Sequence, residues 1–273
     1  MKKLSILTVL AALLLFTGCE ELEKLCNISA EELGFTEDFT KHFNAAVYVY
    51  QQTDRVLRDT TLENAGTAVI DGAICTRTPD SVVIDFGSGV ASALDGKIRK
   101  GSIRVGISGD YMQAGTEANL VMRSYSEEDQ MYDGDIRIVN VSPNANTPAL
   151  TVEVIKFQAD TLKLTSTPMN AAWVSGFDSP EANDDEFNFS GTATLENVNN
   201  AETFQGIINS GTPLNINTGC IYTFVSGVID LVPSNPDKYP TVGIDFVDGD
   251  CANVMMVNVD CDGNSLQVPL NIK

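Results

Sequence analysis

The sequence predicts a mainly β protein: an antiparallel, β-sandwich-like body, built from two related halves, with one amphipathic helix at its N-terminal side. Apolar and polar residues alternate with a period of two from Thr67 onward, which is the pattern of half-buried strands. Asp-Gly pairs, which tolerate the positive φ of tight hairpins, divide these segments. Before Thr67 the apolar period is close to that of a helix.

We expect the helix over residues 29–58. Ser29 followed by Glu32 fits a capping box, and Gly34 is the candidate break. An apolar face recurs every three or four positions and should pack on the β body, at Phe35, Phe39, Phe43, Ala46 and Tyr50. His42 is the single histidine of the sequence, so no second histidine is present to ligate a metal with it.

The strands are expected in two units, 67–177 and 187–273. Residues 103–107, 152–154 and 266–272 alternate clearly. Hairpin turns are predicted at the Asp-Gly pairs 71–72, 95–96, 133–134, 248–249 and 262–263. Residues 127–132 and 178–186 lack the pattern, and the latter should form an exposed loop that joins the units. Val82–Phe86 recurs as Val242–Phe246, which favours two related halves.

The N-terminus has the pattern of a secretory leader over residues 1–18. Lys2 and Lys3 precede an apolar run that ends at Phe16 and is too short to span a bilayer. The next residues, Thr17-Gly18-Cys19, resemble the lipobox of bacterial lipoproteins, whose cysteine is acylated and becomes the new N-terminus. Palmitate-like chains on Cys19 would hold a soluble body on a membrane without a spanning helix.

Residues 19–28 are expected to be an acidic tether. Glu20, Glu21 and Glu23 resemble the signal that exports some Bacteroidetes lipoproteins to the outer face of the outer membrane; a solvated linker is the alternative. The whole chain has a formal charge of -20, which becomes -22 once the leader is removed. Such a chain offers no cationic face to phosphates, so we expect no nucleic-acid partner.

Six cysteines occur in the sequence, and five remain for pairing once Cys19 is acylated. Cys251 and Cys261 flank a predicted strand that would hold them roughly 33 Å apart, so they should not bridge each other. Cys220 with Cys251 is the first choice for a disulfide. No C-x-x-C motif supports a zinc or redox site.

Several ordered motifs from about Gly66 onward carry a resemblance. They are VVIDFGSGVASALDGKIRKGSIRVGISGDY, GDIRIVNV, LNINTGCIYTFVSGVIDL and VGIDFVDGDCAN. This order is similar to that of a family of uncharacterised Bacteroidetes surface lipoproteins with repeated I-D-F/Y-G-x-G elements and a D-G-x-x-R-x-G turn. Val247 replaces a glycine of the second element, and Val90–Ala93 lacks a cysteine common in the family. The resemblance implies a secreted or surface β-rich domain and no particular activity.

An acidic cluster near the C-terminus is the candidate metal site. Its members are Asp245, Asp248, Asp250, Asp260 and Asp262. Oxygen ligands at alternate positions suit calcium, but the glycine and glutamate positions of a calcium loop are not matched. The alternative is that these acids only cap hairpin turns. No other cofactor is expected.

We expect no enzymatic activity, because no histidine-paired nucleophile motif occurs. The sequence indicates a lipid-anchored envelope protein of the outer membrane, exposed at the cell surface, that acts as a binding or structural module. The alternatives are a carbohydrate-binding lipoprotein of a glycan-uptake system and a fimbrial or adhesive subunit, with a glycan or another envelope protein as partner. The candidate sugar-stacking residues are Trp173, Tyr111, Tyr125 and Tyr132. The candidate exchangeable edge strand of an adhesive subunit is 266–272, although Pro269 protects it.

Overall fold

The computed structural model describes residues 33–93, 95–144, 147–177, 184–220, 224–247, 254–261 and 264–271. The predicted leader (1–18), the tether (19–28) and the capping box at Ser29 lie outside these ranges. Within them the chain is mainly antiparallel β with an N-terminal helix, which confirms the predicted class.

Two helices precede the sheet. Helix α2 (Gly34–Arg58) ends where the sequence predicts, and Gly34 is its first residue rather than a break. Helix α3 (Thr60–Ala65) was not predicted. Asp59 Oδ1 accepts a hydrogen bond from the Leu62 backbone N–H at 2.6 Å, and Gly66, with φ of 73°, ends the helix in the left-handed conformation. This short helix therefore depends on its two caps.

Sixteen strands follow in the described part of the chain. They are β1 (Thr67–Ile70), β2 (Ala73–Arg77), β3 (Ser81–Ala91), β4 (Ile98–Ile107), β5 (Glu117–Glu127), β6 (Gln130–Asn140), β7 (Ala149–Ala159), β8 (Leu162–Ser166), β9 (Met169–Ser175), β10 (Glu186–Asn197), β11 (Glu202–Ile208), β12 (Leu214–Asn217), β13 (Gly227–Pro233), β14 (Val242–Phe246), β15 (Val254–Cys261) and β16 (Asn264–Asn271).

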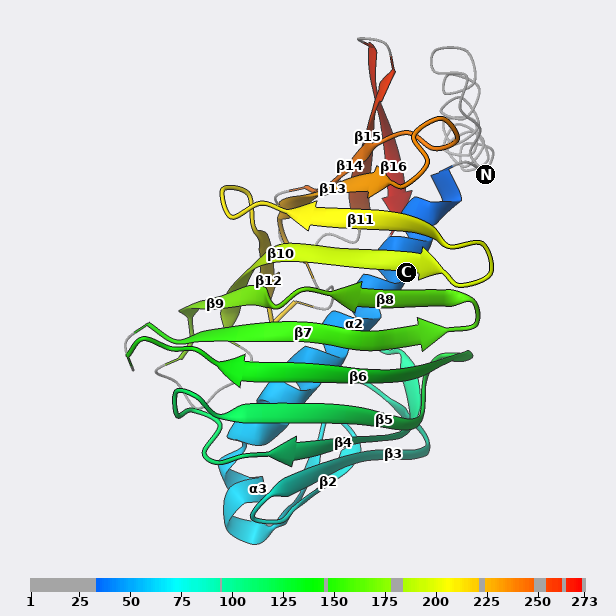
Figure 1. The fold of residues 1–273 in the computed structure, drawn as a ribbon. Coiled ribbons are helices and arrows are strands. Elements are labelled where there is room, and N and C mark those ends of the chain that lie inside the picture. The colour runs from blue at the N-terminus through cyan, green and yellow to red at the C-terminus, as the bar shows by residue number, and fades with distance from the viewer. Residues whose placement is uncertain are drawn as a thin grey trace, which may run out of the picture.

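All the strands belong to one sheet, and neighbours along the chain mostly pair with each other. The order runs from β1 through β8 to β10, β11 and β13 through β16; β9 pairs with β7 and β10, and β12 pairs with β10. The strands of both predicted units thus share one hydrogen-bonded sheet. The core forms between this sheet and helix α2, and not between two stacked sheets as in a sandwich (Figure 1).

Helix α2 is enclosed by the sheet. Every residue from His42 to Tyr50 is buried, and at 100° per residue these nine positions cover all sides of the helix. Gln52 Nε2 reaches the Ile70 carbonyl of β1 at 3.4 Å, and Thr40 Oγ1 lies 3.8 Å from Met255 Sδ of β15. Strands from the two ends of the sheet therefore contact one helix, which crosses behind the central strands in Figure 1.

The predicted aromatic face of the helix packs on the sheet. The rings of Phe35 and Phe204 stack with centroids 4.5 Å apart, and Tyr50 meets the edges of Phe187 and Phe189. The strand residues predicted to alternate behave accordingly. Ile103, Val105 and Ile107 are buried, whereas Arg104 and Gly106 face outward.

Some local predictions were wrong. Asp71-Gly72 and Asp95-Gly96 lie in hairpin turns as predicted, but Asp133-Gly134 lies inside β6, where Gly134 allows close approach to the backbone of β7. Residues 127–132 belong mostly to β5 and β6. Of the loop predicted over 178–186, residues 178–183 lie outside the described ranges, and Asp184 is exposed as predicted. Asp185 is fully buried instead and pairs with Arg58. The pairs 248–249 and 262–263 lie outside the described residues.

Candidate functional site

The structure describes only part of the predicted sites. Cys19, Cys251, Asp248, Asp250 and Asp262 lie outside the described ranges. Cys220 is disulfide-bonded, and its pairing with Cys251 stays a prediction.

The two described acids of the candidate metal site are far apart. Asp245 is paired with Met256 across β14 and β15, and Asp260 lies four residues beyond Met256 on the same outer face. At about 3.3 Å per residue this offsets the two residues by roughly 13 Å along the strands, too far for one ion to contact both carboxylates. Within the described ranges, no group of three potential ligands of the His, Cys, Asp or Glu type is assembled. A calcium site therefore stays a prediction that rests on the undescribed acids.

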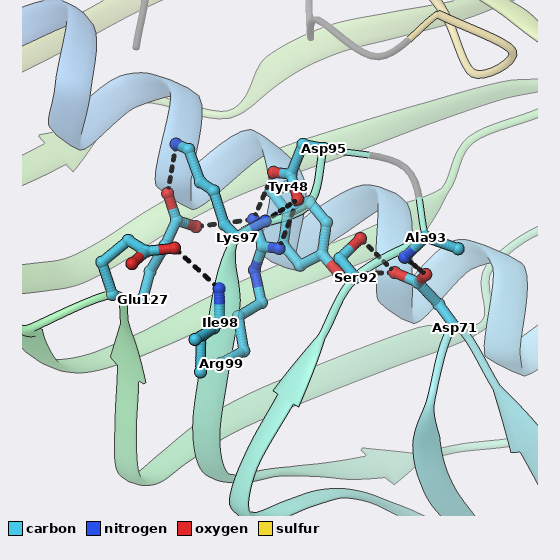
Figure 2. Close-up of polar contacts among 10 residues, drawn as sticks. Tyr48, Asp71, Ser92, Ala93, Asp95, Lys97, Ile98, Arg99 and Glu127 are labelled. Carbon is cyan, nitrogen blue, oxygen red and sulfur yellow. Dashed lines mark hydrogen bonds and ion pairs between the residues drawn. The ribbon is translucent and has the colours of Figure 1, made fainter.

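A buried ionic network, here called the Arg99 cluster, joins helix α2 to the ends of three hairpins (Figure 2). It consists of Tyr48, Asp71, Ser92, Asp95, Lys97, Arg99 and Glu127. Arg99 is 1% exposed, and its guanidinium donates to both carboxylate oxygens of Asp95 and to Glu127 Oε2 at 2.7 to 2.8 Å. Lys97 Nζ binds the other oxygen of Glu127 at 2.5 Å. Arg99 and Lys97 thus form ion pairs with two of the three carboxylates of the cluster.

The helix side of the Arg99 cluster is provided by Tyr48. The Arg99 guanidinium carbon lies 3.2 Å from the centre of the Tyr48 ring, and the Tyr48 hydroxyl donates to Asp71 Oδ2 at 2.9 Å. Asp71 also accepts from Ser92 Oγ and the Ala93 backbone N–H at the end of β3. The carboxylate of Asp71 therefore fixes the turn between β1 and β2 both to helix α2 and to the end of β3.

The electrostatics of the Arg99 cluster indicate a structural role. Burial alone would raise the pKa of Asp95, but the hydrogen bonds and charge of Arg99 outweigh burial and lower it. Burial would lower the pKa of Arg99, but the hydrogen bonds to Asp95 and the charge of Glu127 outweigh burial and raise it. Asp95 and Arg99 therefore hold each other in their charged forms, which is the arrangement of a structural ion pair. The cluster fixes the helix in the sheet.

A second buried network, the Arg58 cluster, lies near the C-terminal end of α2. Arg58 Nη2 donates to Asp54 Oδ2 at 2.8 Å and to Asp185, and the guanidinium lies 4.4 Å from the centre of the Trp173 ring. Trp173 Nε1 donates to Asp185 at 3.2 Å, and the Tyr111 hydroxyl donates to Asp54 at 2.9 Å. Burial raises the pKa of Asp185 despite Arg58. This network connects α2 to β9 and to the start of β10.

The predicted sugar-stacking aromatics are not at the surface. Tyr111, Tyr125, Tyr132 and Trp173 are each no more than 6% exposed and belong to the core or to the two clusters. A stacking platform made of these rings would require the core to open. The sequence could not show this, because strand-end aromatics and exposed loop aromatics look alike in it.

A hollow on the outer face of the sheet is the candidate binding site. We call it the outer hollow; its volume is about 590 Å³, within the range of small-molecule sites. Residues from β10, β12, β13 and β14 and their flanking segments line it: Asn188, Thr212, Pro213, Asn215, Ser226, Gly227, Val228, Asp245 and Val247.

The strand register explains how the outer hollow forms. The first half of β10 pairs with β12, whereas the half after Gly191 pairs with β11. Strand β13 pairs with β11, whereas beside β12 the pairing is reduced to the single bridge of Asn215 with Ser226, next to the close approach of Gly227 to Leu214. Regular strand pairing therefore stops between β12 and β13, and the outer hollow lies where it stops.

Cross-strand pairing positions the two amides and the carboxylate of the outer hollow. Asn188 lies opposite Asn215, whose Nδ2 donates to Asn188 Oδ1 at 3.0 Å. Asp245 lies opposite Val228. Gly227, with φ of 111°, brings its backbone against Pro213, where a Cβ would overlap the Pro213 carbonyl. Asp245 is the member of this site that sequence reasoning singled out, though for a metal; Asn188 and Asn215 carried no local signal.

Comparison with protein-family models, with curated proteins and with solved structures finds no match to this chain. The assignment of the site therefore depends on its own geometry.

Proposed function

We propose that the chain is a lipid-anchored cell-envelope protein whose β body is a binding module, with the outer hollow as its binding site. The outer hollow carries the proposal, because amide, hydroxyl and carboxylate groups from separate strands converge there on one open space. The Arg99 and Arg58 clusters support it by fixing the helix against the sheet, so that the outward side chains are presented on a rigid scaffold.

Binding without catalysis is part of the proposal. The imidazole of His42 is buried, with Nδ1 2.8 Å from the Asp38 carbonyl of its own helix. Cys75 is also buried, and burial raises the pKa of its thiol to about 12. Neither group faces the outer hollow, whose lining offers hydrogen bonds and one carboxylate.

Anchoring is supported by the leader and by the lipobox-like Thr17-Gly18-Cys19. In the part of the chain that the structure describes, no helix has the length and apolarity needed to cross a membrane. Acyl chains on Cys19 would supply the membrane affinity, and the acidic tether would hold the body away from an anionic surface.

The test is metabolic labelling of the full chain with radioactive palmitate, followed by membrane fractionation and protease shaving of intact cells. We expect label and membrane association in the wild type and in Cys26→Ser, loss of both in Cys19→Ser, and digestion of the body by external protease. Label retained in Cys19→Ser, or a wild type found without label, would overturn the anchoring. Protection from external protease would overturn exposure at the surface.

An adhesive subunit is the second candidate function. Strand β16 pairs with β15 and forms an edge of the sheet, and its outward Pro269 lies opposite Met256. Proline at an edge removes a backbone donor and discourages strand addition. Concentration-dependent light scattering of the full chain in detergent tests this candidate, and a constant mass would exclude assembly through β16.

A further inference from the structure

We infer that the ligand of the outer hollow is a neutral, polyhydroxylated molecule, that is, a saccharide unit. This inference rests on the proposed binding function and adds the chemical class of the ligand. It follows from three properties of the described lining residues: paired amides, one negative charge without a positive one, and apolar patches between the polar groups.

The paired amides match neighbouring hydroxyl groups. The hydrogen bond from Asn215 Nδ2 to Asn188 Oδ1 fixes the two side chains relative to each other and uses one donor and one acceptor. Each amide has two N–H donors and an oxygen with two lone pairs, so donor and acceptor capacity remains on both. A hydroxyl both donates and accepts, and two neighbouring hydroxyls can therefore bond to a prearranged amide pair.

The charge of the lining selects against anions. Among the nine lining residues that the structure describes, none is Lys, Arg or His, and Asp245 is the charged one. Asp245 is half-buried, and it would repel a phosphate, sulfate or carboxylate while accepting a hydrogen bond from a hydroxyl. The net charge of -20 on the whole chain acts in the same direction.

The remaining described lining combines the hydroxyl residues Thr212 and Ser226 with apolar side chains and a glycine. Val228 and Pro213 lie beside the polar groups, and the glycine at position 227 keeps the β12–β13 junction free of a side chain. Saccharide rings present C–H patches between their hydroxyls, so a surface that alternates apolar and polar groups fits them better than a purely polar or purely apolar one. None of the described lining residues is aromatic, and we therefore expect a dissociation constant of roughly millimolar for a single sugar unit.

The experiment applies the full chain in detergent to an array of immobilised neutral, anionic and amino saccharides. Sugars that bind on the array are then titrated in free form by calorimetry. Binding variants are Asn188→Ala, Asn215→Ala and Asp245→Ala. Matched controls are Asn119→Ala and Asp135→Ala, which change outward residues of β5 and β6 that lie away from the outer hollow. The melting temperature of each variant separates a loss of binding from a loss of folding.

We expect neutral saccharides to bind to the wild type. A site variant whose melting temperature equals that of its control should bind at least about tenfold more weakly, and the controls should bind within about twofold of wild type. Absence of neutral binding at millimolar sugar, or equal binding in site variants and controls, would overturn the inference. Binding of amino compounds alone would overturn the ligand class while leaving the outer hollow as the site. Palmitate labelling at Cys19 is independent of all these outcomes, so failure of the ligand class and failure of the anchoring are distinguishable.

Discussion

Asp95 accepts two parallel hydrogen bonds from the Arg99 guanidinium, one at each carboxylate oxygen, at 2.8 and 2.7 Å. The two residues are the Asp and the Arg of the D-G-x-x-R-x-G turn that the sequence singles out by resemblance. The turn brings them together at the start of β4, where Glu127 of β5 completes the pairing of Arg99. The motif therefore has a structural explanation: it closes the β3–β4 hairpin on helix α2.

Arg99→Met is expected to lower the free energy of unfolding by about 3–5 kcal/mol, because it leaves the carboxylates of Asp95 and Glu127 without their buried partner. Urea unfolding followed by the fluorescence of Trp173 measures this. Arg137→Met is the control, since Arg137 pairs with Glu117 on the exposed face and its loss should change the urea midpoint little. Equal midpoint shifts for the two variants would contradict a stabilising Arg99 cluster.

Gly101→Ala is expected to destabilise the protein by at least about 2 kcal/mol more than Gly96→Ala. Both glycines have positive φ, of 77° and 72°, but a Cβ at Gly101 would overlap the Ser124 carbonyl oxygen, whereas a Cβ at Gly96 meets open space. The comparison separates steric overlap from backbone conformation. Thermal unfolding of the two variants gives the difference, and similar melting temperatures would contradict the close approach of β4 to β5.

Stability is expected to fall as the pH drops below about 6.5 because of His42. Burial lowers the pKa of His42, although the Asp38 carbonyl and the charges of Asp38 and Asp160 oppose the shift; Lys41 adds to it. Between pH 6.5 and the lowered pKa of the folded state, the unfolded chain therefore binds a proton at His42 more readily than the folded chain does. The free energy of unfolding falls by up to about 1.4 kcal/mol per pH unit in this range.

His42→Leu should flatten this part of the pH profile, measured as melting temperature between pH 7 and 5. Burial raises the pKa of Asp38 and of Asp185, so these acids act in the opposite direction, favouring the folded state as the pH falls towards their pKa values. The difference between wild type and variant isolates the imidazole. An unchanged profile in His42→Leu would show that other groups set the pH dependence.

Cys75 is expected to be unreactive in the folded protein. Its thiol is fully buried, and its pKa is raised to about 12, so it stays protonated at ordinary pH. Titration with a thiol reagent at pH 8 should give the same count for wild type and Cys75→Ala when folded, and one fewer thiol for the variant in urea. A difference of one thiol in the native state would mean that β2 opens.

Features set by neighbours in the chain could be predicted. The end of α2 at Arg58, its aromatic face and the alternation of Ile103, Val105 and Ile107 follow from periodicity alone. The failure at Asp133-Gly134 has a physical reason: a glycine also serves a strand where a neighbouring backbone approaches closely, and β7 approaches there. Local sequence does not distinguish the two uses.

Features set by distant pairings could not be predicted. The outer hollow depends on a change of partners along β10 at Gly191, which brings Asn188 beside Asn215. Neither amide differs in sequence from an ordinary outward residue of a strand. Acids cluster around Asp245 in the sequence, and this pattern predicts a metal site. Its described neighbours in the outer hollow are amides, hydroxyls and apolar groups instead, so its surroundings in space do not follow from its neighbours in the sequence.

Enclosure of helix α2 has a kinetic consequence. Thr40 contacts Met255, 215 positions later in the chain, so the helix is covered only after almost every strand has been made. Contacts of such long sequence separation require large loops to close and slow the folding of a β protein. The buried polar residues of the helix, such as Asn44 and Thr53, would meanwhile keep contact with water. We expect folding in seconds or longer, with arrival of the last strands as the limiting step.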